Sequence, residues 1–450
     1  MKYILLVTTS LMLSGCLLTT PEHETIPSPA VWTASTQGIE KQTPQNLHGW
    51  WKGFNDPALN QLVDIALKGS PDRRMAEARI LEARGLRRAV NSALFPQLQA
   101  SGSAGRAKNL NTNFKAGELY DAGFDASYEI DIFGRNRSNS DAADANFEAR
   151  SAEYHDVSLT LVSEVTRAYV ELRAAQKQSE IAYKNLEAQQ KTLELVRQQK
   201  ELGEAPQLDV ERSEGLVNTT KASIPEFDRQ ADNARLRLSV LTGEMPEKIK
   251  PLVEAKSDVI SDIKPVLLAP AEVINQRPDV RAAQFNLEAQ TSLTKAEIAS
   301  IFPTVTLAGF FGIADTALID STTIWSSGIS AAVSLLNFGR ISGNIDAAKA
   351  RETQSFELWR KTVLQAVTDV EISLTDYAHI KERKVTLQQA AANAERSLNL
   401  SQQLYKEGEV SFLDVLDAQR TVNNANAEVV GAEEALSLSL VALYKSLGVY

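Results

Sequence analysis

The amino-acid sequence predicts a mixed α+β membrane protein that contains two internal repeats. Three observations support this prediction: the two halves of the 450-residue chain match each other, short segments alternate apolar and polar residues, and long polar stretches are nearly free of glycine and proline. Alternation with a period of two is typical of a strand with one apolar face. Long polar stretches with sparse apolar positions are typical of helices that pack along thin seams. Each half is therefore expected to combine strands with very long helices.

The chain begins with a segment that predicts export. "MKYILLVTTSLMLSGC" has a positive residue, an apolar run over residues 3–13, and small residues before Cys16, the single cysteine. The apolar run is too short for a membrane-spanning helix, so residues 1–15 are predicted to be a signal peptide. "LSGC" resembles the bacterial lipobox, which implies cleavage before Cys16 and attachment of lipid, such as palmitate, to this cysteine. An ordinary signal peptide that happens to contain a thiol is the alternative.

Residues 16–70 are predicted to form the lipidated N-terminal segment and part of an equatorial region around the middle of the molecule. Leu17 stands where an aspartate would resemble an inner-membrane retention signal, so the lipoprotein is expected in the outer membrane. In "WWKGF", the side chains of Trp50, Trp51 and Phe54 are expected to pack against the linker and the chain ends rather than to bind a ligand.

Two halves of the chain match at an offset of 205–207 residues. "SPDRRMAEARILEA" matches "RPDVRAAQFNLEAQ", "LFPQLQASG" matches "IFPTVTLAG", "IDIFGR" matches "LLNFGR", and "GEAPQLDV" matches "GEVSFLDV". Four matched blocks in one order indicate a duplication. The sequence therefore predicts a first repeat over residues 71–243, a linker over 244–270 that is rich in proline and lysine, and a second repeat over 271–450.

Each repeat shows the same order of helices and strands. A helix starts at a proline, Pro71 or Pro278, and a "FP" pair ends it. Two extended segments of about 10 residues or more follow, which is long enough for a tilted transmembrane strand. A half-buried sheet of a soluble protein would show the same alternation and is the alternative. The four segments cover residues 97–106, 120–132, 304–313 and 325–335.

The longest polar stretches, residues 138–202 and 344–407, predict helices too long for a compact domain. At 1.5 Å per residue, each would reach roughly 95 Å. Four strands from one chain cannot close a barrel, since the smallest bacterial barrels need about 8, and open sheet edges cannot face lipid. Two or more chains must therefore share one barrel, and their helices would form a tube. This counting leaves a dimer and a trimer open.

Several function classes are disfavoured by composition and motifs. The formal net charge of -10 argues against nucleic-acid binding, which needs a basic surface. The sequence contains no P-loop, no GxGxxG after a strand and no GxSxG motif, so an enzyme is not expected. The four histidines are far apart and none has a metal-ligand spacing, so neither a metal site nor a cofactor is expected: they are His23, His48, His155 and His379.

The segment "SFLDVLDAQR" at the start of the last helix contains candidate functional residues. Ser411 and Asp414 fit the S-x-x-D form of a capping box. Asp417 and Arg420 lie further along the helix. At the equivalent positions, the first repeat keeps an acid for Asp414 but has arginine for Asp417 and glycine for Arg420. The fold alone therefore does not require Asp417 and Arg420, which suggests a role specific to the second repeat.

The whole pattern resembles the TolC family of outer-membrane channels, and most closely its NodT-like lipoprotein branch, over nearly the whole mature chain. The most specific segments are "LSGC", "WWKGFNDPALNQLVDIAL", "ALFPQLQASG", "IFPTVTLAG", "RPDVRAA", "VLDAQR" and two copies of "FGR". The resemblance implies a homotrimer with a 12-stranded transmembrane β-barrel, four strands from each chain, continuous with a long periplasmic α-helical barrel.

The resemblance also implies a function. The chain would be the outer membrane exit duct of a tripartite efflux system in a Gram-negative bacterium, lipid-anchored and extending into the periplasm. It would export small toxic molecules or drugs, together with a periplasmic adaptor protein and a proton-driven inner-membrane pump. An outer membrane channel for type I protein secretion is the first alternative. A periplasmic coiled-coil lipoprotein scaffold without a pore is the second.

Family resemblance assigns roles to particular residues near the periplasmic tip of the channel. By position, Asp414, Asp417 and Arg420 match residues that form the channel gate. Tyr405 and Asp209 match a pair that clamps adjacent helices. The sequence departs from one branch of the family at Val410, where an arginine joins this clamp, so the resting contacts at the tip are expected to differ.

Overall fold

The computed structural model describes residues 29–34, 39–41, 48–108, 116–254, 265–316 and 319–450. The predicted signal peptide and Cys16 lie outside these residues. The chain divides into two compact units. The strand unit contains Ala78–Ala152 and Arg281–Thr362, and the helical unit contains Pro27–Glu77, Glu153–Val280 and Val363–Tyr450. Each unit combines segments of both repeats, so the boundary between the repeats divides the sequence but not the fold.

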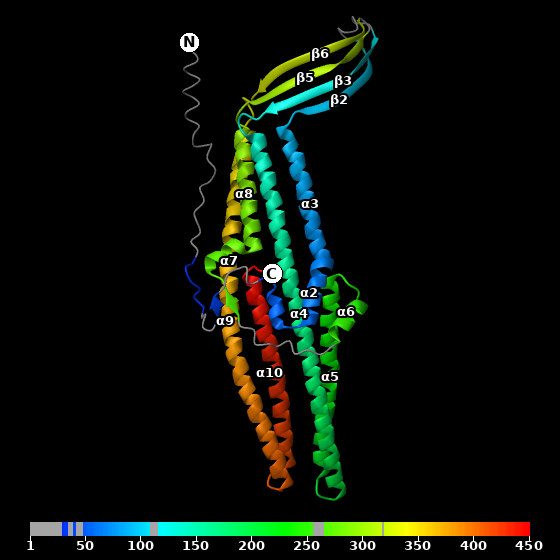
Figure 1. Ribbon diagram of the computed structural model, residues 1–450, viewed down its shortest axis with the longest axis vertical. Coiled ribbons are helices and arrows are strands. Elements are labelled where there is room, and N and C mark those ends of the chain that lie inside the picture. The colour runs from blue at the N-terminus through cyan, green and yellow to red at the C-terminus, as the bar shows by residue number, and fades with distance from the viewer. Residues whose placement is uncertain (1–28, 35–38, 42–47, 109–115, 255–264, 317–318) are drawn as a thin grey trace. The chain divides into compact units, whose positions relative to one another are not determined.

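The strand unit is built on a four-stranded antiparallel sheet in the order β2-β3-β5-β6 (Figure 1). The central pair, β3 and β5, joins the first repeat to the second. β3 and β6 begin before the predicted segments, at residues 117 and 319, because backbone hydrogen bonds continue where the side-chain alternation weakens. They also end before the predicted ends of 132 and 335, at residues 130 and 332. The strands are β2 (Gln97–Ala107), β3 (Gly117–Ile130), β5 (Thr304–Thr316) and β6 (Ile319–Ala332).

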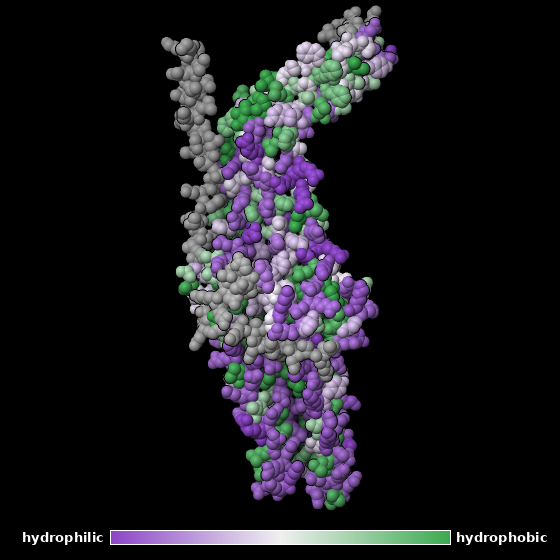
Figure 2. All heavy atoms as spheres, in the orientation of Figure 1, coloured by the Kyte–Doolittle hydropathy of each residue, from purple (hydrophilic) through white to green (hydrophobic). Residues whose placement is uncertain are grey.

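One face of this sheet is apolar and exposed. Phe124 pairs with Phe311, and Phe311 pairs with Trp325, so an aromatic row crosses three strands. All three side chains are exposed, Trp325 to 74%. Figure 2 shows hydrophobic residues over the sheet. A soluble protein rarely leaves such a face uncovered, whereas transmembrane strands present it to lipid. The exposed face therefore favours the membrane sheet over its soluble alternative.

Helices continue directly from the strands. Gly134 and Gly339 adopt positive φ values just before the two longest helices, and Phe133 stacks on Phe302 beside the first of these turns, with ring centroids 4.5 Å apart. These helices were predicted from residues 138 and 344, and each begins three or four residues earlier. The helices that enter the strand unit are α3 (Pro71–Asn91), α4 (Arg135–Glu201), α8 (Pro278–Ala299) and α9 (Arg340–Lys406).

The helical unit carries the remaining long helices and the equatorial region. The predicted linker is wrong in part, since residues 246–253 form a helix and residues 266–267 form a strand. The high proline and lysine content concealed apolar residues that are buried there. The unit adds β1 (Glu40–Lys41), α2 (Pro57–Gly69), α5 (Gln207–Thr242), α6 (Pro246–Val253), β4 (Val266–Leu267), α7 (Pro270–Gln276) and α10 (Phe412–Ser446), besides a short 3₁₀ helix at Trp50–Phe54.

The tryptophan segment packs as the sequence predicted. Trp50, Trp51 and Phe54 are buried, and Trp50 stacks on Tyr444 near the C-terminus with ring centroids 5.0 Å apart. The same apolar cluster includes residues of α6 and β4, such as Leu267. The chain ends and the former linker are therefore held together by one core.

No helix among the described residues is both long and apolar enough to cross a membrane.

Candidate functional site

The candidate site lies where two helical hairpins of the helical unit end. The turn between α4 and α5 and the turn between α9 and α10 have the same backbone hydrogen bonds. Gly203 and Gly408 adopt positive φ values, as a Schellman turn requires. The bonds are Glu204 N to Gln199 O, Gly203 N to Lys200 O, Glu409 N to Leu404 O and Gly408 N to Tyr405 O, all between 2.8 and 3.0 Å. The two repeats thus share one turn geometry.

Capping at the start of α10 involves Asp414. Its carboxylate accepts hydrogen bonds from the Ser411 backbone N–H at 2.9 Å and from the Ser411 hydroxyl at 2.7 Å. These two hydrogen bonds lower the pKa of Asp414, because they favour the charged carboxylate. The side chain therefore satisfies a free donor at the helix start, as the S-x-x-D spacing predicts.

The start of α5 in the first repeat does not have this side-chain cap. Pro206 precedes α5 and has no N–H to be capped. Asp209, which occupies the position of Asp414, instead lies 3.5 Å from the Arg212 guanidinium. The acid that caps α10 thus takes part in an ion pair at the start of α5.

An acid–arginine pair also occurs in the second repeat, one turn further from the tip. The Asp417 carboxylate and the Arg420 guanidinium are 3.7 Å apart, and both side chains are more than half exposed. The three-residue spacing is the same as that of Asp209 and Arg212. Both repeats therefore have an acid–arginine ion pair, but the pair of the second repeat lies about one turn further along its helix.

Tyr405 links the two hairpins of one chain. Its hydroxyl donates to Gln199 Oε1 at 2.9 Å, and its ring packs against Phe412. Burial, and then the negative charge of Asp209, raises the pKa of the Tyr405 hydroxyl. The predicted clamp joined Tyr405 to Asp209. Within the single chain, the hydrogen bond joins Tyr405 to Gln199 of α4, and the charge of Asp209 acts on the same hydroxyl. The clamp itself stays a prediction.

Apolar packing holds the hairpins together next to this hydrogen bond. The buried cluster combines apolar side chains of α4, α5 and α10. Its members are Leu193, Val196, Val210, Leu216, Val217, Phe412, Val415 and Leu416. Deeper along α10, the buried Gln419 side chain donates to the Thr192 hydroxyl of α4 at 3.2 Å. The two hairpins therefore meet through an apolar layer followed by a polar contact.

Arg420 also lines a groove between α4, α5 and α10 with a volume of about 470 Å³. It is the single charged residue among the described residues that line this groove. The others are mostly small polar or apolar side chains, including Asn185, Thr219, Asn423 and Asn424. Arg420 can thus reach either Asp417 or the mouth of the groove.

Sequence reasoning missed Gln199, Thr192 and Gln419. Gln419 carried a detectable signal, because it follows Val415 and Leu416 on an otherwise apolar stripe of α10. Gln199 carried none, since its partner is 206 residues away and their contact depends on how two hairpins pack.

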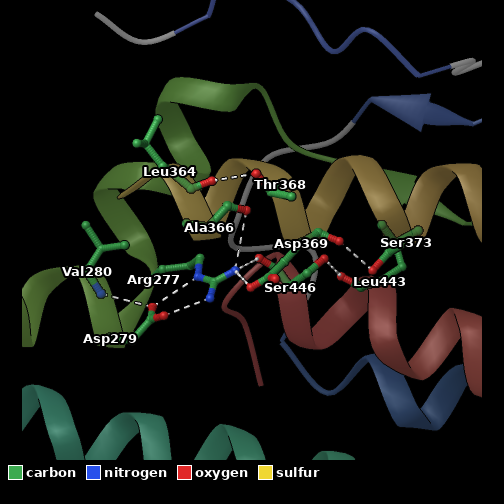
Figure 3. Close-up of polar contacts among 10 residues, drawn as sticks. All are labelled: Arg277, Asp279, Val280, Leu364, Ala366, Thr368, Asp369, Ser373, Leu443 and Ser446. Carbon is green, nitrogen blue, oxygen red and sulfur yellow. Dashed lines mark hydrogen bonds and ion pairs between the residues drawn. The ribbon is translucent and has the colours of Figure 1, made fainter. Parts of the chain in front are cut away.

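A second polar cluster lies at the junction of α7 and α8 (Figure 3). Arg277 donates to both carboxylate oxygens of Asp279, at 3.0 and 2.7 Å, and to Asp369 of α9 at 3.0 Å. It also donates to the Ser446 carbonyl at the end of α10, at 3.2 Å. Its side chain is 11% exposed. Burial opposes the charge, but Asp279 and Asp369 outweigh it and raise the pKa of Arg277.

A sheet with an exposed apolar face, joined to long polar helical hairpins, is the architecture of an outer-membrane channel subunit. The sequence profile of the outer membrane efflux protein family matches residues 62–244 and 269–449. The chain belongs to this family. The two matched segments correspond to the two repeats, and the match confirms the family, the outer-membrane location and the efflux function that the sequence resemblance implied.

Named relatives cover nearly the whole chain. The pyoverdine export outer membrane protein OpmQ of Pseudomonas aeruginosa is 28% identical over 461 residues, which cover 100% of this chain and 97% of OpmQ. Nodulation protein T of Rhizobium leguminosarum bv. trifolii is 29% identical over 437 residues, which cover 94% of this chain and 92% of nodulation protein T. The cation efflux system protein CusC of Escherichia coli K12 is 27% identical, with 98% and 97% covered.

Solved structures share the fold. The outer-membrane channel OprN superimposes with a TM-score of 0.85 at 31% identity, covering 96% of this chain and 99% of OprN. CusC superimposes with a TM-score of 0.86 at 25% identity, with 96% and 99% covered. The pore-free scaffold considered from the sequence is therefore excluded, since the chain has the fold and family of efflux channels.

Proposed function

We propose that the chain forms a homotrimer that serves as the exit duct of a tripartite efflux system. Three four-stranded sheets would close one 12-stranded barrel, and the long helices would continue it as a periplasmic tunnel. Two features support this arrangement. β2 and β6 each have one edge without a paired strand among the described residues. The exposed aromatic row on the sheet suits lipid contact.

The duct would work with a periplasmic adaptor protein and a proton-driven inner-membrane pump, and would be tethered to outer membrane lipid through Cys16. It would use no cofactor or metal of its own and catalyse no reaction. Its cargo would be small toxic molecules or drugs. The names of OpmQ and CusC refer to pyoverdine and cations, which favours small solutes over type I protein secretion.

The hairpin ends would form the gate. Asp414, Asp417 and Arg420 on α10 would line the narrowest point, while Tyr405 and Asp209 would hold adjacent helices. The observation that carries this assignment is the shift of the acid–arginine pair by one helical turn between the repeats. Around a threefold axis, this shift would place two charged rings at different heights, and the exposed Asp417 and Arg420 could pair with a neighbouring chain when the tip is closed.

Conductance across a planar bilayer tests the gate. The variant D417A/R420A should raise the resting conductance severalfold, because it removes the polar contacts of the upper ring. Y405F should raise it less, because it removes one neutral hydrogen bond. E226A/R229A is the matched control, since it deletes an exposed pair of the same spacing on α5. Equal conductance of D417A/R420A, the control and the wild type would remove the gate assignment.

A further inference from the structure

The groove between α4, α5 and α10 is lined mainly by side chains that can form hydrogen bonds. Its volume of about 470 Å³ lies within the range of small-molecule sites in proteins. Three of its lining side chains carry hydroxyl groups, and four carry amide groups: Gln178, Asn185, Asn423 and Asn424. None of these four amide side chains has a hydrogen-bond partner among the described residues. Their donors and acceptors are therefore available to a ligand.

The two ends of this groove differ in chemistry. Arg420 follows Gln419, which bonds Thr192 near the tip, so Arg420 lines the end of the groove nearest the tip. Phe227 and Ala427 line the opposite end, because α5 and α10 both run away from the tip. Seven residues of helix separate Arg420 from Ala427, which is about 10 Å. A ligand that uses both ends therefore carries a negative charge at one end and an apolar face at the other.

Two buried glutamines lie next to the charged end of the groove. Gln189 is one turn beyond Asn185 on α4, and Gln419 directly precedes Arg420 on α10. Gln189 is 4% exposed, and neither atom of its amide group has a hydrogen-bond partner in the part of the chain that the structure describes. The amide oxygen of Gln419 has none there either. A buried amide without a partner is unfavourable, so a ligand that reaches it from the groove gains hydrogen bonds that the fold does not supply.

The guanidinium group of Arg420 can accept a second acidic partner. Its distance to the Asp417 carboxylate, 3.7 Å, is too long for a hydrogen bond, and both side chains are more than half exposed. A carboxylate in the groove could instead form two parallel hydrogen bonds with the guanidinium, which is the stronger arrangement. Because Arg420 is the charged residue of the groove lining, the groove favours anions over cations.

We propose that this groove binds a small solute with one carboxylate and several hydroxyl groups, as in a sugar acid. The carboxylate would pair with Arg420, the hydroxyl groups with the amides of α4 and α10, and an apolar face with Phe227. A planar amide offers a donor and an acceptor side by side, which suits neighbouring hydroxyl groups, and an aromatic ring suits the C–H face of a sugar. The site lies within one chain, so it depends neither on the proposed homotrimer nor on the proposed gate.

Isothermal titration calorimetry on the full-length protein in detergent tests the site, with glucuronate as the probe. Glucuronate should bind saturably. Glucose lacks the charge and propionate lacks the hydroxyl groups, so each should bind at least about tenfold more weakly, because each loses one kind of contact. The absence of saturable glucuronate binding, or equal affinity for the three probes, would overturn the proposal.

Substitutions of charged residues locate the carboxylate of the probe. R420Q should weaken glucuronate binding at least about tenfold and leave glucose binding unchanged, because it removes the charge alone. D417A should strengthen glucuronate binding severalfold, because Asp417 no longer competes for the guanidinium. R383Q is the matched control, since Arg383 is a similarly exposed arginine that pairs with Glu428 outside the groove. Unchanged affinity in R420Q, or an equal loss in R383Q, would show that Arg420 does not hold the carboxylate.

Substitutions of amides test the rest of the groove. N185A/N424A should weaken glucuronate and glucose binding alike, because both probes carry hydroxyl groups. Q189L should weaken glucuronate binding without lowering the melting temperature, because leucine replaces an amide that has no partner in the fold. Wild-type affinity in Q189L would remove the buried end from the site, and a lower melting temperature would show that Gln189 supports the fold instead.

Discussion

The first and second repeats end their helical hairpins with the same backbone turn and then use different polar chemistry. In the first repeat, Pro206 leaves Asp209 to pair with Arg212. In the second, Ser411 binds Asp414, and the ion pair moves one turn along the helix. The shared glycines preserve the turn, so the side chains could diverge without disturbing it. After a duplication, the side chains at a turn can thus change as long as the glycine that forms the turn is kept.

The strand unit shows the same divergence between α3–α4 and α8–α9. Phe147 lies under the guanidinium groups of Arg84 and Arg87, at 5.8 and 5.5 Å from the ring centroid. At the positions that match Phe147 and Arg84, the second repeat has Glu352 and Thr291, whose side chains are hydrogen-bonded at 3.1 Å. Cation–π packing in one repeat is therefore replaced by a neutral-to-acid hydrogen bond in the other.

The largest expected difference between the repeats lies at the junction before α3 and α8. Arg277 and Ser70 occupy equivalent positions; Ser70 is buried, and the Arg277 side chain is only 11% exposed. R277L should lower the free energy of unfolding by about 3–5 kcal/mol, because it leaves Asp279 and backbone carbonyls without their buried partner. S70A should change it by less than about 0.5 kcal/mol, since the Ser70 hydroxyl has no hydrogen-bond partner among the described residues.

Loss of helical circular dichroism on heating in detergent measures both variants. R277K provides a further control, because lysine keeps the charge but cannot reach the carboxylates and carbonyls at once. If R277L and S70A melt at the same temperature, the Arg277 cluster does not distinguish the repeats.

A smaller difference is expected at the glycines that end α5 and α10. Gly243 and Gly448 both have positive φ values. A Cβ on Gly243 would lie 2.5 Å from the Gly69 carbonyl oxygen, whereas a Cβ on Gly448 would lie 2.7 Å from the Arg277 Cγ and 2.9 Å from the Arg277 Cα. The contact at Gly243 is therefore the closer of the two, and its nearest atom belongs to the backbone. G448A should therefore cost about 1–2 kcal/mol and G243A more.

The same thermal measurement ranks the two glycine variants. Equal melting temperatures for G243A and G448A would show that the backbone strain, which both share, outweighs the difference in their neighbours.

The smallest expected effect is the pH dependence of the two tips. Two hydrogen bonds from Ser411 hold the pKa of Asp414 below its ordinary value of 3.8. Because the pKa is lower in the folded state, the charged carboxylate stabilises the cap at pH values above that ordinary value. This stabilisation is lost as the pH falls through the lowered pKa. Amide exchange at residues 411–415, corrected for intrinsic rates, should therefore become severalfold faster between pH 6 and pH 3.

Residues 206–210 should lack this change, because the first repeat has no Ser–Asp contact at its tip. D414N is the control and should remove the pH dependence at residues 411–415. Acceleration that persists in D414N would assign the effect to another group.

The sequence by itself determined the duplication, the four strands, the long helices, the tryptophan layer and the cap at Asp414. These features follow from rules that act over a few residues: side-chain alternation, proline at helix starts, glycine in tight turns and the spacing of a capping box. The signal peptide and Cys16 also come from sequence alone.

Only the tertiary structure decided that β3 of one repeat pairs with β5 of the other, that Tyr405 binds Gln199, and that Arg277 binds Asp369 and the end of α10. The predicted linker contains a helix and a strand because its few apolar residues pack against residues far away in the chain. Such contacts join segments separated by tens to hundreds of residues, and packing rather than local spacing selects among the partners.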